Sequence, residues 1–516
     1  NHGRHGHDNT QSDTTTMHQT RSDAPYTSMR IHNWEDSNSY PGPYNTIENI
    51  DIGFTSREWV IDQERINSTH SAILVHGETQ GLRFGNLSKG GTTDENIWLA
   101  VVNETGSWTE LAHFHFQTER DTDNQPKGLG MTISPNGTIW ITVWWSGFLE
   151  VPGFSRLTGS GFNILSWHPG TGWASNEQIN GFQNSYDVPF DAVIDGMGDL
   201  WVSGACRYTV SIGSFSSSGS SSYLTCFARR NVTNGWNAVY RSYSQNSPRV
   251  DAIAGHPNGG IVFWTRGDYY LTPSGSSVYV SNNEAGGLVR LFSNNGSMYL
   301  WDRPACSTSS NQCNLVQSMD VRSNGDIVIG GHFRNSISFS GCCSVNSGGG
   351  SDGYIAMWNA TLHTWGWSIA LGGTSDDQLY DVRFIGNGSI ASVGQKSGVI
   401  SVGLTTLSSA GTGFVAMASD QGTWSWAQQP TGDTRIRTVI PAGNGSIEVA
   451  GELLYDVNPR IFGLDSLRSS DGEDLFVSRM SADQDADGIT NNRDNCLSIY
   501  NPPQADFEND GIGDIC

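Results

Sequence analysis

The sequence predicts an all-β fold: a seven-bladed β-propeller with four-stranded blades, followed by a small irregular segment at the C-terminus. Two observations support the propeller. Turn-then-strand units recur about sixty residues apart along most of the chain. The composition is rich in Gly, Ser, Asn and Thr, with 18 Trp and only 15% charged residues, which suits short strands and tight turns rather than helices.

Each unit is marked by a glycine that precedes an apolar, mostly β-branched run. Asn stands before this glycine in all but one unit, and Asn-Gly indicates a tight hairpin because both residues tolerate positive φ. The glycines are Gly137, Gly198, Gly259, Gly325, Gly388 and Gly445. A Trp-bearing strand is expected upstream of each turn, at Trp108, Trp173, Trp236, Trp301, Trp367 and Trp426.

Two further strands complete the expected unit. A short apolar run opens it, as at 97–99, 354–357 and 414–417, and a more variable strand follows the turn, as at 399–402. Four strands in about sixty residues are typical of a propeller blade with long loops. A β-helix would have a far shorter period, and tandem sandwich domains would need seven strands each.

The ends of the repeat region predict how the ring closes. A degenerate first unit lies near 59–62 and 71–75, which brings the number of units to seven. One apolar strand, 475–480, follows the last unit and has no unit of its own. We expect it to complete the first blade, so that no β edge is left exposed. The propeller then covers residues 46–480.

Residues 1–45 form a polar extension with almost no apolar side chains. A metal-binding tail is one interpretation, because His2, His5, His7 and His18 lie close in sequence. Disorder is the usual meaning of such a composition.

Residues 481–516 carry two half-loops of a calcium-binding type. Asp483, Asp485 and Asp487 alternate along the backbone before Gly488, and the pattern restarts at Asp506. Alternating oxygen ligands followed by a glycine at the sixth position fold inward around calcium. The Ile489 and Ile512 carbonyls take the seventh position of each loop, and Asp494 takes the twelfth of the first.

This segment resembles the thrombospondin type 3 repeat, in which Asp runs alternate with Asp-Asn-Cys and end in Gly-x-Asp-x-Cys. The resemblance implies a Cys496–Cys516 disulfide. Asn491 and Glu508 depart from the family pattern, since Asp is usual at both positions. An acidic disordered tail is the alternative, but without cations its eight acids and one Arg would repel one another. The expected calcium ligands are Asp483, Asp485, Asp487, Ile489, Asp494, Asp506, Glu508, Asp510, Ile512 and Asp514.

The last three repeat units resemble the secreted seven-bladed propeller repeats of bacterial and archaeal surface proteins. The stretches 424–429, 449–452 and 474–478 carry this resemblance. It implies an extracellular surface module, usually without enzymatic activity, and names no ligand.

Charge, hydropathy and cysteine content narrow the function classes. A net charge of −23 argues against nucleic-acid binding, which needs clustered Lys and Arg. No run approaches 18 apolar residues, so no membrane span is expected. The chain begins with Asn rather than Met, which fits removal of a signal peptide.

Eight cysteines fit an oxidising compartment. Besides Cys496–Cys516, the candidate pairs are Cys306–Cys313, Cys206–Cys226 and the vicinal Cys342–Cys343. Glycosylation is permitted by nine Asn-x-Ser/Thr sequons. They lie at Asn67, Asn86, Asn103, Asn136, Asn231, Asn295, Asn359, Asn387 and Asn444.

No catalytic signature is found among those of known propeller enzymes. Ser419 to Trp424 comes near a sialidase box but has the wrong spacing, and the quinone-docking motif and the serine nucleophile elbow lack support. Glycosidases need two convergent carboxylates, which a sequence alone does not reveal. We expect the repeated Trp residues to pack between blades. The cluster of Trp140, Trp144 and Trp145 is less easily explained by packing and leaves open a sugar-stacking role.

These patterns together predict a secreted, non-catalytic structural or adhesive protein of the cell surface, stabilised by Ca²⁺. We expect it to form a homo-oligomer or polymer in which residues 1–45 dock on an adjacent copy. Cell-surface glycans or proteins are possible partners. The alternative is a glycan-binding or glycan-processing propeller with its site at the axis, which carboxylates, Arg and Trp at the centre of the ring would favour.

Overall fold

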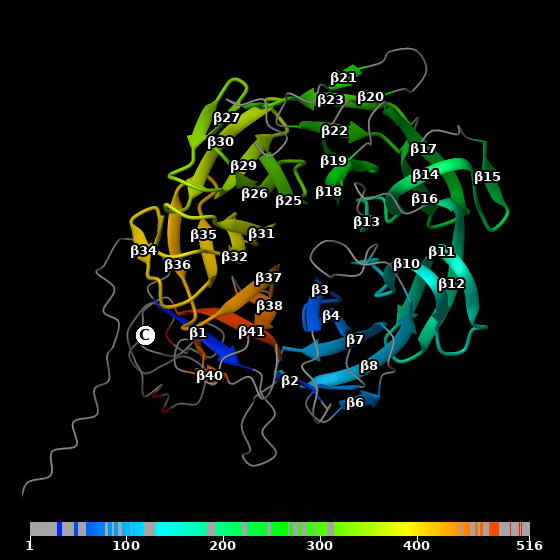
Figure 1. Cartoon of the computed structure of the whole chain (residues 1–516), viewed down its shortest axis with the longest axis horizontal. Coiled ribbons are helices and arrows are strands. Elements are labelled where there is room, and N and C mark those ends of the chain that lie inside the picture. Colours follow the sequence, from blue (N-terminus) through cyan, green and yellow to red (C-terminus); the bar gives the residue numbers. More distant parts are fainter. Residues whose placement is uncertain are drawn as a thin grey trace, which may run out of the picture.

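The computed structural model of the chain is built from antiparallel β-strands (Figure 1). The structure describes residues 28–33, 46–49, 58–77, 81–84, 87–90, 95–104, 106–117, 129–182, 191–218, 224–244, 249–266, 269–271, 278–280, 286–293, 296–306, 314–386, 388–442, 446–454, 460–462, 465–467, 474–483, 496, 505 and 507. Over these residues, no helix has the length and apolar character needed to cross a membrane.

The main strands pair in consecutive sets of four. The first three sets are β3 (Glu58–Arg65), β4 (His70–Gly77), β7 (Glu95–Asn103) and β8 (Trp108–Phe116); β9 (Gly130–Ile133), β10 (Ile139–Glu150), β11 (Leu157–His168) and β12 (Gly172–Phe182); and β13 (Asp191–Ile194), β14 (Leu200–Ile212), β16 (Leu224–Asn231) and β17 (Gly235–Ser244). The long strands β10 and β14 also pair with the last strand of the preceding set, which joins these sets into one continuous sheet.

The remaining sets follow the same order. They are β18 (Arg249–Gly255), β19 (Ile261–Arg266), β22 (Gly287–Leu291) and β23 (Met298–Asp302); β25 (Asn314–Val321), β26 (Ile327–Phe333), β29 (Asp352–Asn359) and β30 (Thr364–Leu371); β31 (Gln378–Phe384), β32 (Ile390–Gln395), β35 (Gly413–Ala418) and β36 (Trp424–Gln428); and β37 (Thr434–Pro441), β38 (Ile447–Leu453), β41 (Asp474–Asp483) and β2 (Thr46–Asn49).

The remaining, shorter strands lie outside the sets of four. They are β1 (Ser28–Asn33), β5 (Gly81–Phe84), β6 (Leu87–Gly90), β15 (Phe215–Ser217), β20 (Tyr269–Leu271), β21 (Val278–Val280), β24 (Ala305–Cys306), β27 (Ser336–Phe339), β28 (Cys343–Asn346), β33 (Ile400–Val402), β34 (Thr405–Leu407), β39 (Arg460–Phe462) and β40 (Asp465–Leu467).

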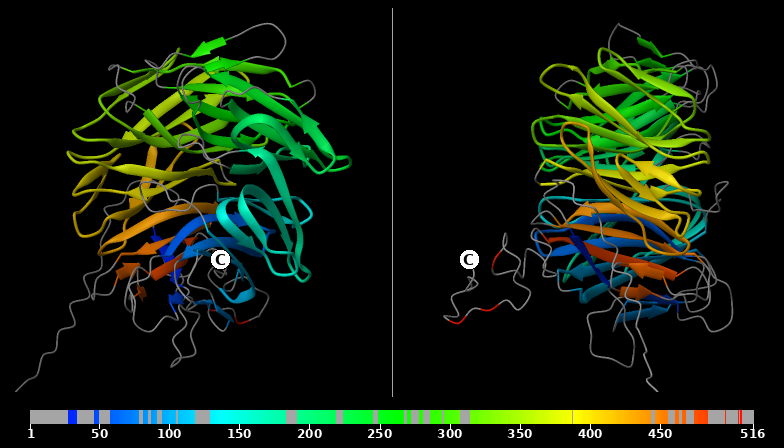
Figure 2. Two further views of the ribbon diagram at one scale, coloured as in Figure 1. Left: turned by 45° about the vertical axis from the view of Figure 1, so that its right-hand side comes forward. Right: turned by 90° about the vertical axis from the view of Figure 1, so that its left-hand side faces the viewer.

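The first strands of the sets form a ring. The strands β3, β9, β13, β18, β25, β31 and β37 each lie beside the next, and β37 lies beside β3. The sheets radiate from this centre, and Figures 1 and 2 show the ring from its face and from oblique and side views. The arrangement is propeller-like, as the repeat in the sequence predicted. We call these first strands the inner strands.

The repeated turn joins the first and second strand of a set. Its glycine has positive φ at Gly137, Gly198, Gly259, Gly325 and Gly388, with values from 77° to 90°. These angles strain any residue with a Cβ, which is why glycine recurs there. Gly445 lies outside the described residues.

The unit boundaries predicted from the sequence are shifted relative to the sheets. The apolar runs expected to open each unit are third strands, such as β29, and the Trp strands are fourth strands, such as β30. The inner strand before the turn was missed, and the run at 399–402 instead falls in the separate hairpin of β33 and β34. The first unit is not degenerate, because β3, β4, β7 and β8 pair in the full order.

The prediction that strand 475–480 completes the first blade is wrong. These residues lie in β41, which pairs with β38 and is therefore the third strand of the last set. Its other edge is covered by two N-terminal strands, β2 opposite Leu475 and Phe476 and β1 opposite residues 478–483. The last set thus combines both ends of the chain, and β1 uses part of the 1–45 extension within the same molecule.

Apolar cores lie between neighbouring sheets. Strands such as β26 are buried along their whole length, because adjacent sheets cover both of their faces. One core joins Val60 and Ile73 of the first set to Ala450, Leu475 and Val477 of the last. The junction of the chain ends is therefore packed like any other neighbouring pair of sheets.

Candidate functional site

The predicted calcium segment falls almost wholly outside the described residues. Asp483 is the last residue of β41, and the other nine expected ligands are not described. Cys496 is buried and disulfide-bonded, while its expected partner Cys516 is not described. Among the residues that are described, no three His, Cys, Asp or Glu side chains are grouped so as to hold a metal ion. The N-terminal histidines also lie outside the described residues.

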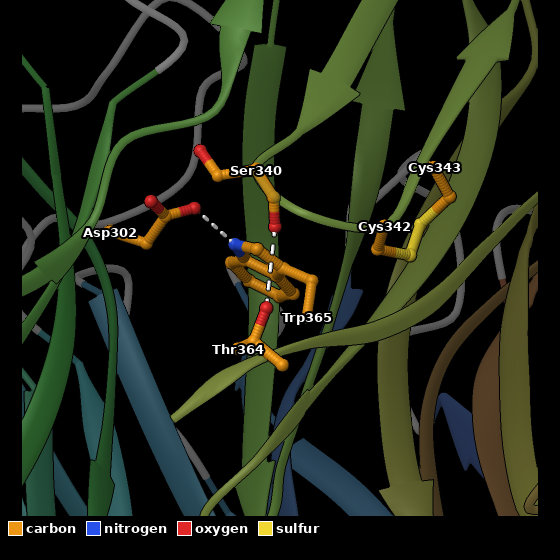
Figure 3. Close-up of a disulfide and its surroundings, with 6 residues drawn as sticks. All are labelled: Asp302, Ser340, Cys342, Cys343, Thr364 and Trp365. Atoms are coloured by element: carbon orange, nitrogen blue, oxygen red, sulfur yellow. Dashed lines mark hydrogen bonds between the residues drawn. A yellow bond between two sulfur atoms is a disulfide. The ribbon is translucent and has the colours of Figure 1, made fainter. Parts of the chain in front are cut away.

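Two of the predicted disulfides are confirmed. Cys206–Cys226 joins β14 to β16, with Cα atoms 5.7 Å apart and both residues buried. Cys342–Cys343 is a vicinal pair in the turn from β27 to β28, with Cys343 the first residue of β28. Figure 3 shows this pair near Ser340, whose carbonyl accepts a hydrogen bond from the Thr364 hydroxyl at 3.4 Å.

The repeated Trp residues contact the neighbouring set, as expected for packing. Trp236 donates to Glu177 of the preceding set at 2.6 Å, and Trp367 donates to the carbonyl of Asp420 in the following set at 2.8 Å. The irregular Trp cluster is also buried: Trp140, Trp144 and Trp145 are each at most 8% exposed. Packing therefore accounts for that cluster as well.

A cavity of about 340 Å³ lies where the inner strands meet. Residues from each inner strand line it, so it is on the axis of the ring. Its volume falls in the range of small-molecule sites. The charged residues that line it are Asp62, Asp191, Asp251, Asp381, Arg383 and Arg437.

β-Bulges help to aim side chains at this cavity. Five inner strands carry a register shift, and in each the extra residue lines the cavity. A bulge turns a side chain away from the regular alternation of a strand. The extra residues are Ile61, Asp251, Gln317, Tyr380 and Arg437.

Several inner-strand carboxylates connect neighbouring strands. Each accepts the N–H of the following residue with one oxygen and an N–H of the next inner strand with the other. The bonds run to Asp62 from Gln63 (2.8 Å) and Met131 (3.1 Å), to Asp320 from Val321 (2.8 Å) and Phe384 (2.8 Å), and to Asp381 from Val382 (2.9 Å) and Val439 (2.9 Å). These acids therefore tie the ring together.

Burial makes the axial acids hard to ionise. Burial and the nearby Asp191 carboxylate raise the pKa of Asp62 to about 7. Burial also raises the pKa of Asp191 to about 7 and that of Glu64 to about 8. Arg383 opposes these shifts, with its guanidinium 3.6 Å from both the Glu64 and Asp381 carboxylates.

The sequence analysis named none of these axial residues, although the repeat holds a signal for them. Asp191 and Asp381 occupy the same place before the turn glycines Gly198 and Gly388. Aligning the units on the turn would have placed both at the axis. The inner strands were missed because their polar residues break the apolar pattern by which strands were sought.

Comparisons with known proteins give limited information. No protein-family model and no curated protein matches the sequence. The fold is similar to a protein of unknown function from Dyadobacter fermentans DSM 18053, with 10% identity and a TM-score of 0.36 over 88% of this chain and 99% of that one. It is also similar to the polysaccharide lyase Uly1, with 11% identity and a TM-score of 0.39 over 80% and 88% of the two chains. A europium-containing methanol dehydrogenase matches with 10% identity and a TM-score of 0.33 over 78% and 90%. Similarities this distant carry no argument about chemistry.

Proposed function

We propose that the chain is a seven-bladed β-propeller that acts as a rigid, non-catalytic module of a secreted or cell-surface protein. The proposal rests on the hydrogen bonds that the axial carboxylates accept. In Asp62, Asp320 and Asp381, one carboxylate oxygen accepts the N–H of the following residue and the other accepts an N–H of the next inner strand. These bonds give the three acids a structural role, because they hold neighbouring inner strands together.

The joined chain ends support a rigid role. β41 and β2 complete one sheet from opposite ends of the sequence, so the ring opens only if that pairing is lost. The disulfides Cys206–Cys226 and Cys342–Cys343 fit an oxidising compartment. The thrombospondin type 3-like segment would add Ca²⁺-dependent order after β41.

A glycan-binding or glycan-processing site at the axis is the second candidate. The cavity, with its carboxylates and Arg383, meets part of what that function requires. Its described lining includes no Trp to stack on a sugar. Assays with glycans as substrates separate the candidates. A processing enzyme would turn over a glycan and lose that turnover in Asp191→Asn, a change at a carboxylate that lines the cavity, whereas a structural module would show no turnover.

Calcium dependence tests the C-terminal part of the proposal. Chelated full-length protein should bind Ca²⁺ in a calorimetric titration, and Asp485→Ala with Asp487→Ala should weaken that binding sharply, because both supply ligands in the resemblance. Asp376→Ala is the matched control, since this exposed Asp lies between β30 and β31, outside the predicted calcium segment. Titrations without a calcium response in the intact protein would reject the segment as a metal site.

The oligomeric state tests assembly. Because β1 and β2 cover the edge of β41, the informative truncation removes residues 1–27 and keeps both strands. Light scattering of full-length and truncated protein, with and without Ca²⁺, should show assembly that needs residues 1–27. Monomers under every condition would remove assembly from the proposal.

A further inference from the structure

Negative side chains outnumber positive ones around the axial cavity. The acids that line it or interact closely with its lining are Asp62, Glu64, Asp191, Asp251, Asp320 and Asp381. The cations are Arg383 and Arg437. Arg437 donates to both carboxylate oxygens of Glu452 at 3.0 and 3.1 Å, and Glu452 also lies 3.7 Å from Arg435. Arg383 lies against Glu64 and Asp381 and also acts on Asp62 and Asp191, so one guanidinium serves several acids.

Among these acids, Asp62 and Asp191 lie close enough for the Asp191 carboxylate to act on Asp62. Their strands, β3 and β13, are separated in the ring only by β9, which contributes Gly130 at the matching position. A Cβ on Gly130 would lie 2.8 Å from Asp191 Oδ1, so glycine leaves this carboxylate room at the cavity wall. The two carboxylates repel each other across this gap, which contributes to the raised pKa of Asp62.

Ser203 provides independent evidence for a polar occupant. It stands opposite Asp191 in the register of β13 and β14 and lines the same cavity. Its side chain is fully buried, yet its hydroxyl has no hydrogen-bond partner in the described part of the chain. A buried hydroxyl without a partner costs free energy, which a ligand that hydrogen-bonds to it would recover.

We propose that the axial cavity binds a small organic cation through a primary ammonium group held by Asp62, Asp191 and the Ser203 hydroxyl. An ammonium group has three N–H donors, which matches two carboxylates and one hydroxyl. Both oxygens of Asp62 already accept a backbone N–H and each retains a second lone pair, so the ligand adds to the ring contacts without replacing them. This site is independent of the calcium segment and of assembly.

The same ammonium chemistry occurs in alkyl diamines and in amino sugars. Putrescine represents the first source, with uncharged 1,4-butanediol as its matched probe. Glucosamine represents the second, with N-acetylglucosamine as its matched probe. Binding of glucosamine but not putrescine would place the site in glycan recognition, and the reverse would make it a polyamine site; either result supports the proposal.

The experiment is calorimetric titration of the full-length, calcium-saturated protein at about pH 8 and again at about pH 5. For putrescine, binding should be stronger at the higher pH, because carboxylates with a pKa of about 7 are then ionised while its alkyl ammonium groups stay charged. Asp191→Asn keeps an oxygen for the Ala192 N–H and should weaken binding about tenfold or more. Asp376→Asn makes the same change at the exposed edge and should leave binding unchanged.

Ser203→Ala is a second test that leaves every charge in place, and it should weaken binding several-fold. The proposal is overturned if neither amine binds, or if the uncharged probes bind as tightly as the amines. It is also overturned if both Asp191→Asn and Ser203→Ala bind like the native protein.

Discussion

Replacing Asp381 with Ala tests whether the axial carboxylates hold the ring. The change removes the acceptor of the buried Val439 N–H and of the Ser318 hydroxyl, which donates to Asp381 at 2.5 Å, whereas the Val382 N–H keeps the Ser318 hydroxyl as an acceptor at 3.3 Å. Each buried N–H left without a partner costs about 1–3 kcal/mol. Asp381→Ala should therefore lower the free energy of unfolding by about 1–3 kcal/mol, the cost of the Val439 N–H.

Urea unfolding followed by Trp fluorescence measures this loss. Asp376→Ala is the control, because its carboxylate is 55% exposed and accepts from the Ser351 N–H and from Arg334. We expect that variant to lose less than about 1 kcal/mol, as for other exposed pairs. Equal losses in the two variants would refute the reasoning, and the axial acids would then need a role other than joining strands.

Two further predictions concern the disulfides and pH. Replacing Cys206 and Cys226 with Ala should lower the free energy of unfolding by about 3 kcal/mol, as the loop-closure entropy of a link across 20 residues implies. Replacing Cys342 and Cys343 should lower it by under about 1 kcal/mol, because adjacent residues enclose almost no loop. Thermal unfolding of the two double variants measures both losses. The raised pKa of Asp191 means that the folded protein holds a proton between about pH 4 and pH 7 that the unfolded chain has lost, so this group's contribution to stability falls as pH rises through that window. Melting curves should show a smaller loss over this range in Asp191→Asn, and a loss equal to that of the native protein would contradict the assignment.

The sequence predicted the class of fold because its strongest local signal has a direct physical cause. Asn-Gly and the following apolar run specify a tight turn and a buried strand, and the turn glycines adopt the expected positive φ. The Trp positions were equally informative, since one large side chain per unit packs on the neighbouring sheet. These signals depend on a few adjacent residues, so they can be recognised in the sequence without knowledge of distant contacts.

The same signals do not show at which strand of the repeat each sheet begins and ends. A periodic pattern fixes the order of strands but not where one sheet ends, and the visible apolar runs happen to be third strands. Strand 475–480 was assigned to the first blade for this reason. Its pairing with β2 joins residues more than 400 positions apart, and the short strand Thr46–Asn49 has no apolar pattern to reveal it.

The axial site depends on contacts that no local pattern records. Asp62 and Asp191 lie on different sets of strands, and their interaction arises because β3, β9 and β13 lie side by side in the ring and Gly130 leaves space beside Asp191. Ligand binding and ring stability are therefore linked through the same carboxylates. A bound cation removes the repulsion between Asp62 and Asp191, lowers the pKa of both and stabilises the folded state by mass action. The gain should grow as pH rises, because the ligand-free ring must then ionise both acids with Arg383 as their one nearby cation among the described residues that act on them.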